Sequence, residues 1–356
     1  MVVTKPKHLY TRIYIFFLVG PISEAILSNS VKILKNLQYS NGLFSASKPT
    51  VKTGYNAAWI RDCIYESLGF EATKSTKRLK KAYWALLDIL KKHEYKVDWA
   101  IKEKPKYHFQ YIHARYDPFT MEEYYDEWGN KQNDAIGALL FKIGDLELKG
   151  YKIIRDQSDL KAIIKLVDYL ESIEYWHDKD NGMWEESEEI HASSVGACVA
   201  GLKNISKIVD VDPILIKKGE ATLSWLLPNE SESKPVDLAL LSLIYPYDIV
   251  DKKTALQIVK NIETNLVRQK GVIRYIGDRY YSNGSEAEWT KGFPWLAIIY
   301  KHLNNPKKYA HYMRKTLEAM NQKGEMPELY YAGTAKHNEN SPLGWSQALY
   351  IVSATI

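Results

Sequence analysis

Two adjacent glutamates that follow a tryptophan are the residues best suited to chemistry. The stretch 181–194 contains Trp184, Glu185 and Glu186 ahead of an apolar, helix-compatible run that begins near Ala192. An indole beside a carboxyl group excludes water, which disfavours the charged form and keeps the proton on the acid. A carboxyl group of this kind is the proton donor that cleavage of a glycosidic bond requires. The same residues are also compatible with a loop whose acidic side chains cap the next helix.

A second candidate carboxyl group, that of Glu328, lies in an apolar and aromatic stretch near the C-terminus. Glu328 stands between Pro327 and Leu329, with two tyrosines directly after them. A lone glutamate on a loop is usually solvated. These neighbours instead predict a carboxylate that is held in a fixed place.

A tryptophan, an arginine and an aspartate open one of the predicted helices. Trp59, Arg61 and Asp62 lie where a long loop runs into that helix. A guanidinium offers a fork of donors and a carboxylate offers acceptors, so the pair suits adjacent sugar hydroxyls. An arginine–aspartate pair at a helix start is also common as a purely structural feature. The accompanying tryptophan favours the functional interpretation.

Other loops carry aromatic and polar residues of the same kind. Trp128 and Lys131 are compatible with a polar and aromatic wall, whereas the polar run 132–134 is equally compatible with simple helix caps. Arg274 lies on a later loop, and Trp345 begins the last predicted helix. Flat rings with polar edges suit the faces of sugars.

The composition excludes several other classes of function. The chain has 356 residues, and its net charge of +5 comes from basic and acidic residues that are interspersed, which argues against a nucleic-acid-binding face. Ten tryptophans and 26 tyrosines exceed what a core needs. Cys63 and Cys198 fall in predicted helices as buried free thiols, and no Cys/His cluster has the spacing of a zinc site. We therefore expect neither a metal nor another cofactor.

The elements that must position these residues are helices. Apolar residues repeat at helical spacing, and start and stop signals predict helices over 22–38, 57–70, 76–93, 132–149, 157–174, 191–207, 213–228, 236–246, 252–265, 289–303, 306–321 and 341–355. Short and long connections alternate along the chain. Each short connection joins two helices into a hairpin, which gives six hairpins, and the long loops between the hairpins are then expected to lie on one face. This pattern predicts a double ring of helices, with the chemically interesting residues on the long loops. We expect one domain over 22–356.

The N-terminal residues 1–21 are expected to be an extension packed on that domain. Lys5, Lys7 and Arg12 precede a short apolar run, 13–20, which is too short to span a bilayer and has no small-residue cleavage site after it. We therefore expect a cytoplasmic protein that does not bind membranes, with export as the minor alternative.

Five short motifs follow one another along nearly the whole chain. They are Trp59-Ile60-Arg61-Asp62, Trp128-Gly129, Gly182-Met183-Trp184-Glu185-Glu186, Pro327-Glu328 and Pro342-Leu343-Gly344-Trp345-Ser346. This order resembles glycoside hydrolase family 15, the glucoamylase and glucodextranase family. The resemblance implies an all-α fold, the (α/α)6 barrel, and an inverting enzyme that releases glucose from the non-reducing ends of α-glucans or α-glucosides, like a glucan 1,4-α-glucosidase.

The resemblance also implies roles for individual residues. Glu185 matches the general acid and Glu328 matches the general base. Sugar-contacting positions are matched by Trp59, Arg61, Asp62, Trp128, Glu186, Arg274 and Trp345, beside which we place Trp184 and Lys131. Inversion requires the two carboxyl groups to be roughly 6.5–9.5 Å apart, so that a water fits between the base and the sugar. We expect burial to raise the pKa of the acid toward roughly 6–7.

In parts of these motifs the amino-acid sequence is more similar to the glucoamylase-like domain of the phosphorylase kinase alpha and beta subunits. Leu329 stands where the hydrolases have glutamine, as it does in that branch, so we expect Tyr330, Tyr331 or a backbone group to hold Glu328 or its water. The alternative function is therefore a sugar-binding or regulatory module with little or no catalysis. A helical barrel of the prenyltransferase or lanthionine-cyclase kind needs zinc ligands that two distant cysteines do not supply.

Overall fold

The computed structural model describes residues 21–125 and 128–356. The predicted N-terminal extension lies outside the described residues except for Pro21, the first residue of α2. Among the helices described, none combines the length and the apolar composition that a bilayer span requires.

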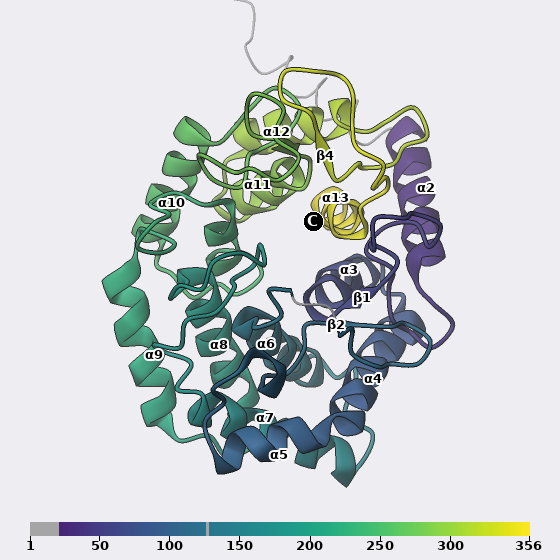
Figure 1. Cartoon of the computed structure of the whole chain (residues 1–356). Helices are drawn as coiled ribbons and strands as arrows, with labels where there is room; N and C mark the ends of the chain where they lie inside the picture. The colour runs from purple at the N-terminus through teal and green to yellow at the C-terminus, as the bar shows by residue number, and fades with distance from the viewer. Residues whose placement is uncertain (1–20, 126–127) are drawn as a thin grey trace, which may run out of the picture.

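Helices account for most of the described chain (Figure 1). They are α2 (Pro21–Leu37), α3 (Ile60–Ala72), α4 (Thr76–Lys92), α5 (Glu94–Lys102), α6 (Asn133–Leu148), α7 (Gln157–Ser172), α8 (Ala192–Ile205), α9 (Pro213–Leu226), α10 (Lys252–Asn265), α11 (Gly292–His302), α12 (Pro306–Glu318) and α13 (Gly344–Thr355). Two short 3-10 segments, η1 (His108–Gln110) and η2 (Leu238–Leu243), lie between them.

The helices form two concentric rings, which confirms the predicted (α/α)6 barrel. In the inner ring, α3, α6, α8, η2, α11 and α13 each contact the next element, and α13 closes the ring by packing on α3. Helices α2, α4, α7, α9, α10 and α12 lie outside them, as the view in Figure 1 shows. The inner helices α6, α8 and α11 are buried almost all round, whereas α4 and α12 bury one stripe and expose the other face.

Two segments differ from the prediction by more than a shift of a few residues at a helix end. The long link after α4 contains an additional helix, α5, which buries Val97 and Ala100 and is separated from α4 only by His93. The segment predicted as a helix over 236–246 forms only the short η2. Pro246 lacks an N–H group and disfavours helical geometry at the residue before it, so η2 has no room to continue.

Short strands tie the long loops together beside the inner helix starts. Strand β1 (Ala58–Trp59) pairs with β2 (Arg115–Tyr116), and β3 (Glu288–Trp289) pairs with β4 (Leu329–Tyr330). The second pairing is extended when the Thr290 N–H donates to the carbonyl of Glu328 at 3.1 Å. Backbone pairing therefore fixes the loop that carries Glu328 against the loop that precedes α11.

The inner ring is tightest where α6 crosses α8. A Cβ atom added at Gly137 would lie 2.4 Å from backbone atoms of α8, and one added at Gly201 would lie 2.5 Å from the carbonyl oxygen of Gly137. The two backbones are therefore in direct contact, which only glycine allows at both positions.

Replacing Gly137 by alanine should destabilise the fold, because the new methyl group meets backbone that cannot move aside. We expect the free energy of unfolding, measured by chemical denaturation, to fall by about 1–3 kcal/mol or more, although alanine itself favours a helix by about 1 kcal/mol. Gly196→Ala on α8 is the matched control, because its nearest neighbours are the ends of flexible Leu243 and Ile249 side chains. Equal losses in the two variants would contradict the role of the backbone contact.

Candidate active site

The long loops meet at one end of the barrel, where they line a small cavity that we name the inner cavity. Residues from the segments before α3, α8, α11 and α13 contribute to it, although these segments are far apart in the sequence. The lining consists of Ala46, Tyr55, Trp59, Arg61, Asp62, Met183, Trp184, Glu185, Arg274, Trp289, Lys291, Glu328, Leu343 and Trp345. Both predicted catalytic glutamates therefore face the same space.

A second, much larger cavity adjoins the first, and we name it the outer cleft. Its volume is about 800 Å³. Its lining consists of Tyr95, Lys96, Trp99, His108, Phe109, His113, Glu123, Tyr124, Tyr125, Trp128, Gly129, Asn130, Asn181, Glu185 and Glu186. Glu185 lines both cavities, so the two cavities meet at this residue.

The loop that carries Glu185 is held in an unusual backbone conformation. Glu185 has a φ of 65°, in the left-handed region that non-glycine residues rarely occupy and that costs of order 1–3 kcal/mol. The Asn181 side chain fixes this turn by donating to the carbonyl of Glu186 at 2.6 Å. Gly129 allows the Trp128 loop to approach, because a Cβ atom there would lie 2.8 Å from the carbonyl oxygen of Glu185.

The environment of Glu185 favours its protonated form. Its side chain is 22% exposed, and one oxygen lies 3.5 Å from Nη1 of Arg61. Burial raises the pKa of Glu185 to about 8; Arg61 opposes the shift and Asp62 adds to it. The direction confirms the expected effect of burial, and the value exceeds the expected range. Glu185 therefore carries a proton at neutral pH.

The neighbouring Glu186 has the opposite environment. It accepts hydrogen bonds from Arg274 at 2.8 Å, from Lys234 at 2.8 Å and from the Tyr275 hydroxyl at 2.6 Å. Burial alone would raise the pKa of Glu186, but these three partners outweigh it and leave the pKa below its usual value. Consecutive glutamates are thus held in different protonation states.

Glu328 is fully buried and is fixed by three side-chain donors. The Tyr55 hydroxyl donates to Oε1 at 2.6 Å, while the Asn338 and Asn340 amides donate to Oε2 at 2.5 and 2.8 Å. Burial raises the pKa of Glu328, while these donors and Lys291 act to lower it, because they favour the charged form. Burial has the larger effect, so the pKa of Glu328 lies above its ordinary value, while the three donors fix the carboxyl group in place.

Tyr330, Tyr331 or a backbone group was expected to hold Glu328 or its water, but the side-chain donors to the carboxyl group are others. The Tyr330 hydroxyl donates instead to the carbonyl of Ala319 at 3.1 Å. The holders are Tyr55, Asn338 and Asn340, which sequence reasoning missed. The alternating Asn-Glu-Asn run at 338–340 was the available signal, because it places two amides on one side of an extended loop.

Lys291 is a further cavity residue that sequence reasoning missed. It is 2% exposed, and its ammonium group lies over the rings of Trp345, Trp184 and Trp289 at 3.8, 4.3 and 4.5 Å from their centroids. Burial lowers the pKa of Lys291 to about 7, which Asp62 partly opposes. The available signal was a lysine placed directly before an otherwise apolar helix.

The Arg61 guanidinium is held in place by hydrogen bonds to residues at the start of α6. Nε and Nη2 donate to both oxygens of Asp134 at 2.5 and 2.8 Å, and Nη2 also donates to Gln132 at 2.6 Å. The run 132–134, which was compatible with simple caps, therefore supplies the counter-charge for Arg61. The third nitrogen of the guanidinium, Nη1, points toward Glu185.

The structure brings most of the predicted sugar-contacting residues to the two cavities. Trp59, Arg61, Asp62, Trp184, Arg274 and Trp345 line the inner cavity, and Trp128 and Glu186 line the outer cleft. Lys131 lines neither cavity, so the structure does not bring it together with the other predicted residues. It is 6% exposed, pairs with Asp178 at 3.0 Å and with Glu188 at 3.5 Å, and lies over the Tyr111 ring, so its charge is compensated.

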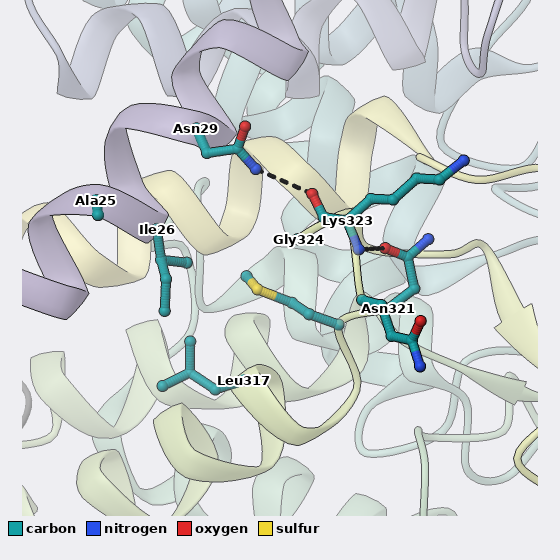
Figure 2. A pocket seen from close by; sticks show the side chains of 9 residues that line it. Ala25, Ile26, Asn29, Leu317, Asn321, Lys323 and Gly324 are labelled. Carbon is teal, nitrogen blue, oxygen red and sulfur yellow. Dashed lines mark hydrogen bonds between the residues drawn. The ribbon is translucent and has the colours of Figure 1, made fainter.

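Another hollow, between α2 and the turn after α12, does not have the chemistry of a catalytic site. Figure 2 shows the Asn29 amide donating to the carbonyl of Lys323 at 3.0 Å across it. Its lining contains neither a carboxyl group nor a tryptophan. Within residues 21–125 and 128–356, no group of three or more histidine, cysteine or acidic side chains is arranged to hold a metal ion.

Comparison with known proteins gives matches in sequence and in structure. The family described as glycosyl hydrolases family 15 matches residues 21–213, just over half of the chain. Phosphorylase b kinase regulatory subunit alpha, liver isoform, from Mus musculus is 27% identical over 391 residues, which cover 88% of this chain and 31% of the relative. This chain thus spans about a third of the length of that relative.

The solved structures that are similar share the fold. A glycosidase variant in complex with glucose superposes with a TM-score of 0.81 at 18% identity, covering 99% of this chain and 98% of that one. Glucoamylase from Saccharomycopsis fibuligera gives a TM-score of 0.66 at 14% identity, covering 93% and 94% of the two chains. Since the family match extends over more than half of the sequence and includes the loop of Glu185, this chain belongs to glycosyl hydrolases family 15.

Proposed function

We propose that this protein is an inverting glycoside hydrolase that releases glucose from the non-reducing ends of α-glucans or α-glucosides. The observation that carries the proposal is the pair of carboxyl groups on one cavity with different environments. Glu185 is held protonated, with a pKa of about 8, and Glu328 is surrounded by donors that favour its charge. An acid and a base of this kind are what inverting hydrolysis uses.

The steps follow from these positions. The terminal sugar occupies the inner cavity, with its glycosidic oxygen at Glu185, where the two cavities meet. Glu185 gives its proton to that oxygen as the bond to the sugar breaks. Glu328 takes a proton from a water that attacks the sugar carbon from the opposite face. Tyr55 and the two asparagines hold the base while it acts.

The other cavity residues support the sugar and the developing charge. The rings of Trp59, Trp184 and Trp345 offer apolar faces to a sugar and exclude water, which strengthens the electrostatic interactions inside. Asp62 offers an acceptor to sugar hydroxyls, and Arg274 is oriented by Asp278 at 2.6 Å. Positive charge that develops on the sugar in the transition state is favoured by the ionised Glu328.

A second candidate function is a sugar-binding or regulatory module with little or no turnover. The observation that favours it is the similarity to phosphorylase b kinase regulatory subunits over most of this chain. Leu329 after the base is a feature that the hydrolase motif does not have. Reducing-sugar release from malto-oligosaccharides, measured beside binding of the same sugars, separates the two candidates.

Glu185→Gln should abolish hydrolysis and preserve binding, because the amide keeps the shape of the side chain and cannot deliver a proton. We expect the rate on malto-oligosaccharides to fall by roughly 10²–10⁴-fold, with sugar affinity by calorimetry almost unchanged. α-Glucosyl fluoride needs less proton donation and should be affected less. Glu318→Gln on the exposed face of α12 serves as the control. An equal loss on both substrates would contradict the acid role.

The activity should decline on the alkaline side with a midpoint near pH 8. Glu185 has a raised pKa of about 8, so the active protonated form is present below this pH and is lost as the pH rises through it. The measurement is kcat/KM against pH for the native protein. The alkaline decline should be absent when the residual activity of Glu185→Gln is measured on α-glucosyl fluoride. If the decline persists in that variant, it is caused by another group, such as Lys291.

The first product should be the β-anomer of glucose, because attack by a water on Glu328 inverts the α-linkage. Proton NMR of the anomeric signals during the first minutes of reaction, before mutarotation, gives the result directly. An α-anomer would exclude inversion. Sugar binding without turnover on any α-glucoside would make the binding module the better account.

A further inference from the structure

We propose that Lys291 selects the sugar that the inner cavity accepts, because its ammonium group donates a hydrogen bond to one hydroxyl group of the terminal sugar. Lys291 is then a specificity-determining residue, in addition to the two glutamates and the side chains that hold them. The proposal deepens the proposed function and rests on it in one respect, that a sugar occupies the inner cavity. It holds whether or not that sugar is cleaved.

Lys291 has a position in the chain that helix stability does not explain. It is the residue directly before α11, where the start of a helix favours negative rather than positive charge. Lys291 is also only 2% exposed, and a buried charge is costly. A residue that breaks two such local rules is expected at a functional site.

The backbone beside Lys291 is fixed to the loop of the second glutamate. The Thr290 N–H donates to the carbonyl of Glu328 at 3.1 Å, and the Trp295 N–H donates to the carbonyl of Lys291 at 3.2 Å. Lys291 therefore directly follows a residue that is bonded to the loop of Glu328, and both Lys291 and Glu328 line the inner cavity. This anchoring limits where the lysine side chain can lie, as selection of a ligand requires.

The ammonium group of Lys291 differs in its partners from the two guanidinium groups of the inner cavity. Arg61 donates to Asp134 at 2.8 Å, and Arg274 donates to Asp278 at 2.6 Å. Within the part of the chain that the structure describes, Nζ of Lys291 makes neither a hydrogen bond nor an ion pair. Its contacts are three indole rings that line the same cavity, the nearest with its centroid at 3.8 Å.

Indole rings compensate the charge of an ammonium group but leave its hydrogen-bonding capacity unused. A cation–π contact acts through the quadrupole of the ring, whereas each of the three N–H groups of a lysine can donate to an oxygen. Buried polar groups in proteins nearly always have a hydrogen-bond partner. Since the three rings and Lys291 all line the inner cavity, the partner of Lys291 is the molecule that fills this cavity.

The charges around Lys291 favour a neutral hydroxyl group over an anion as that partner. Asp62 and Glu328 line the same cavity and attract the ammonium group, so negative charge is already supplied. Burial outweighs this attraction and lowers the pKa of Lys291 to about 7. A hydroxyl group can accept from Lys291 and donate to Asp62, because it has one donor and two acceptor positions. A sugar hydroxyl therefore satisfies both groups without adding charge to the cavity.

A hydrogen bond of this kind makes the inner cavity reject sugars that lack the hydroxyl group. A deoxy sugar leaves the buried donor unpaired, and sites that are built on such a bond discriminate strongly against the analogue. We expect a loss of affinity of roughly 10–100-fold, which is the range for a hydrogen bond to a charged group.

The test pairs one side chain with one hydroxyl group, with catalysis switched off. The full chain carrying Glu185→Gln is titrated, with NMR detection of weak binding, with methyl α-glucoside and with its four derivatives that lack the hydroxyl group at C2, C3, C4 or C6. Adding Lys291→Met should weaken the parent sugar by roughly 10–100-fold. The same change should remove the penalty for one deoxy sugar and leave the penalties for the other three in place.

Lys291→Leu is a second apolar variant and should remove the same penalty. Lys315→Met is the matched control, because Lys315 also lies over an aromatic ring, that of Phe293 at 4.7 Å, and lines neither cavity. It should leave the affinities for all five sugars unchanged.

Losses that are equal for all five sugars, or penalties that all persist in both apolar variants, would overturn the proposal, because a purely structural role of Lys291 predicts them. Failure of methyl α-glucoside to bind to the Glu185→Gln protein would overturn it as well. Hydrolysis of α-glucosides by the native protein would leave the proposed function in place in these cases. Conversely, a penalty that depends on Lys291 in a protein that hydrolyses no α-glucoside would remove the proposed enzymatic function and keep the selection by Lys291.

Discussion

The removal of water from charged groups at the end of the barrel is the constraint on which the rest of the structure depends. Closing six inner elements into a ring brings two arginines, a lysine and several carboxyl groups into a space with little solvent. A buried charge without a partner is costly, and breaking a buried pair costs about 3–5 kcal/mol. Arg61 therefore has Asp134 and Gln132, and Lys291 has three indole rings. The cavity is stable because nearly every charge in it is compensated.

The same constraint separates the roles of two glutamates that are adjacent in the sequence. Glu186 faces Arg274, Lys234 and Tyr275 and stays ionised, while Glu185 faces Arg61 at a longer distance and keeps its proton. The left-handed backbone at Glu185 directly precedes Glu186, whose carboxyl group accepts the hydrogen bonds of Arg274, Lys234 and Tyr275. Backbone strain is thus held beside the inner cavity, as is often found at functional sites.

Much of the fold could be predicted from the sequence, because helical spacing of apolar residues is a local signal. The double ring followed from alternating short and long links, whereas α5 was missed because a single histidine separates it from α4. Glu185 and Glu328 were visible through their sequence neighbours. Tyr55 and Lys291 were not, because they act through contacts with residues far away in the chain. Asn338 contacts Glu328 across a loop that has no regular repeat, although the two residues are near in sequence. The pairing of Lys131 with Asp178 on another loop was not visible either.

The closure of the inner ring by α13 on α3 has a consequence for how the protein folds. These two helices are separated by most of the chain, so the contact that completes the barrel is among the most distant in sequence. Such contacts form late, because the entropy of closing a long loop must be overcome first. During synthesis the loop of Glu185 emerges long before Glu328 and Trp345. Until the last helix docks, the inner cavity lacks Trp345, one of the residues that line it beside Glu185. The burial that raises the pKa of Glu185 is therefore complete only after the end of the domain has been made.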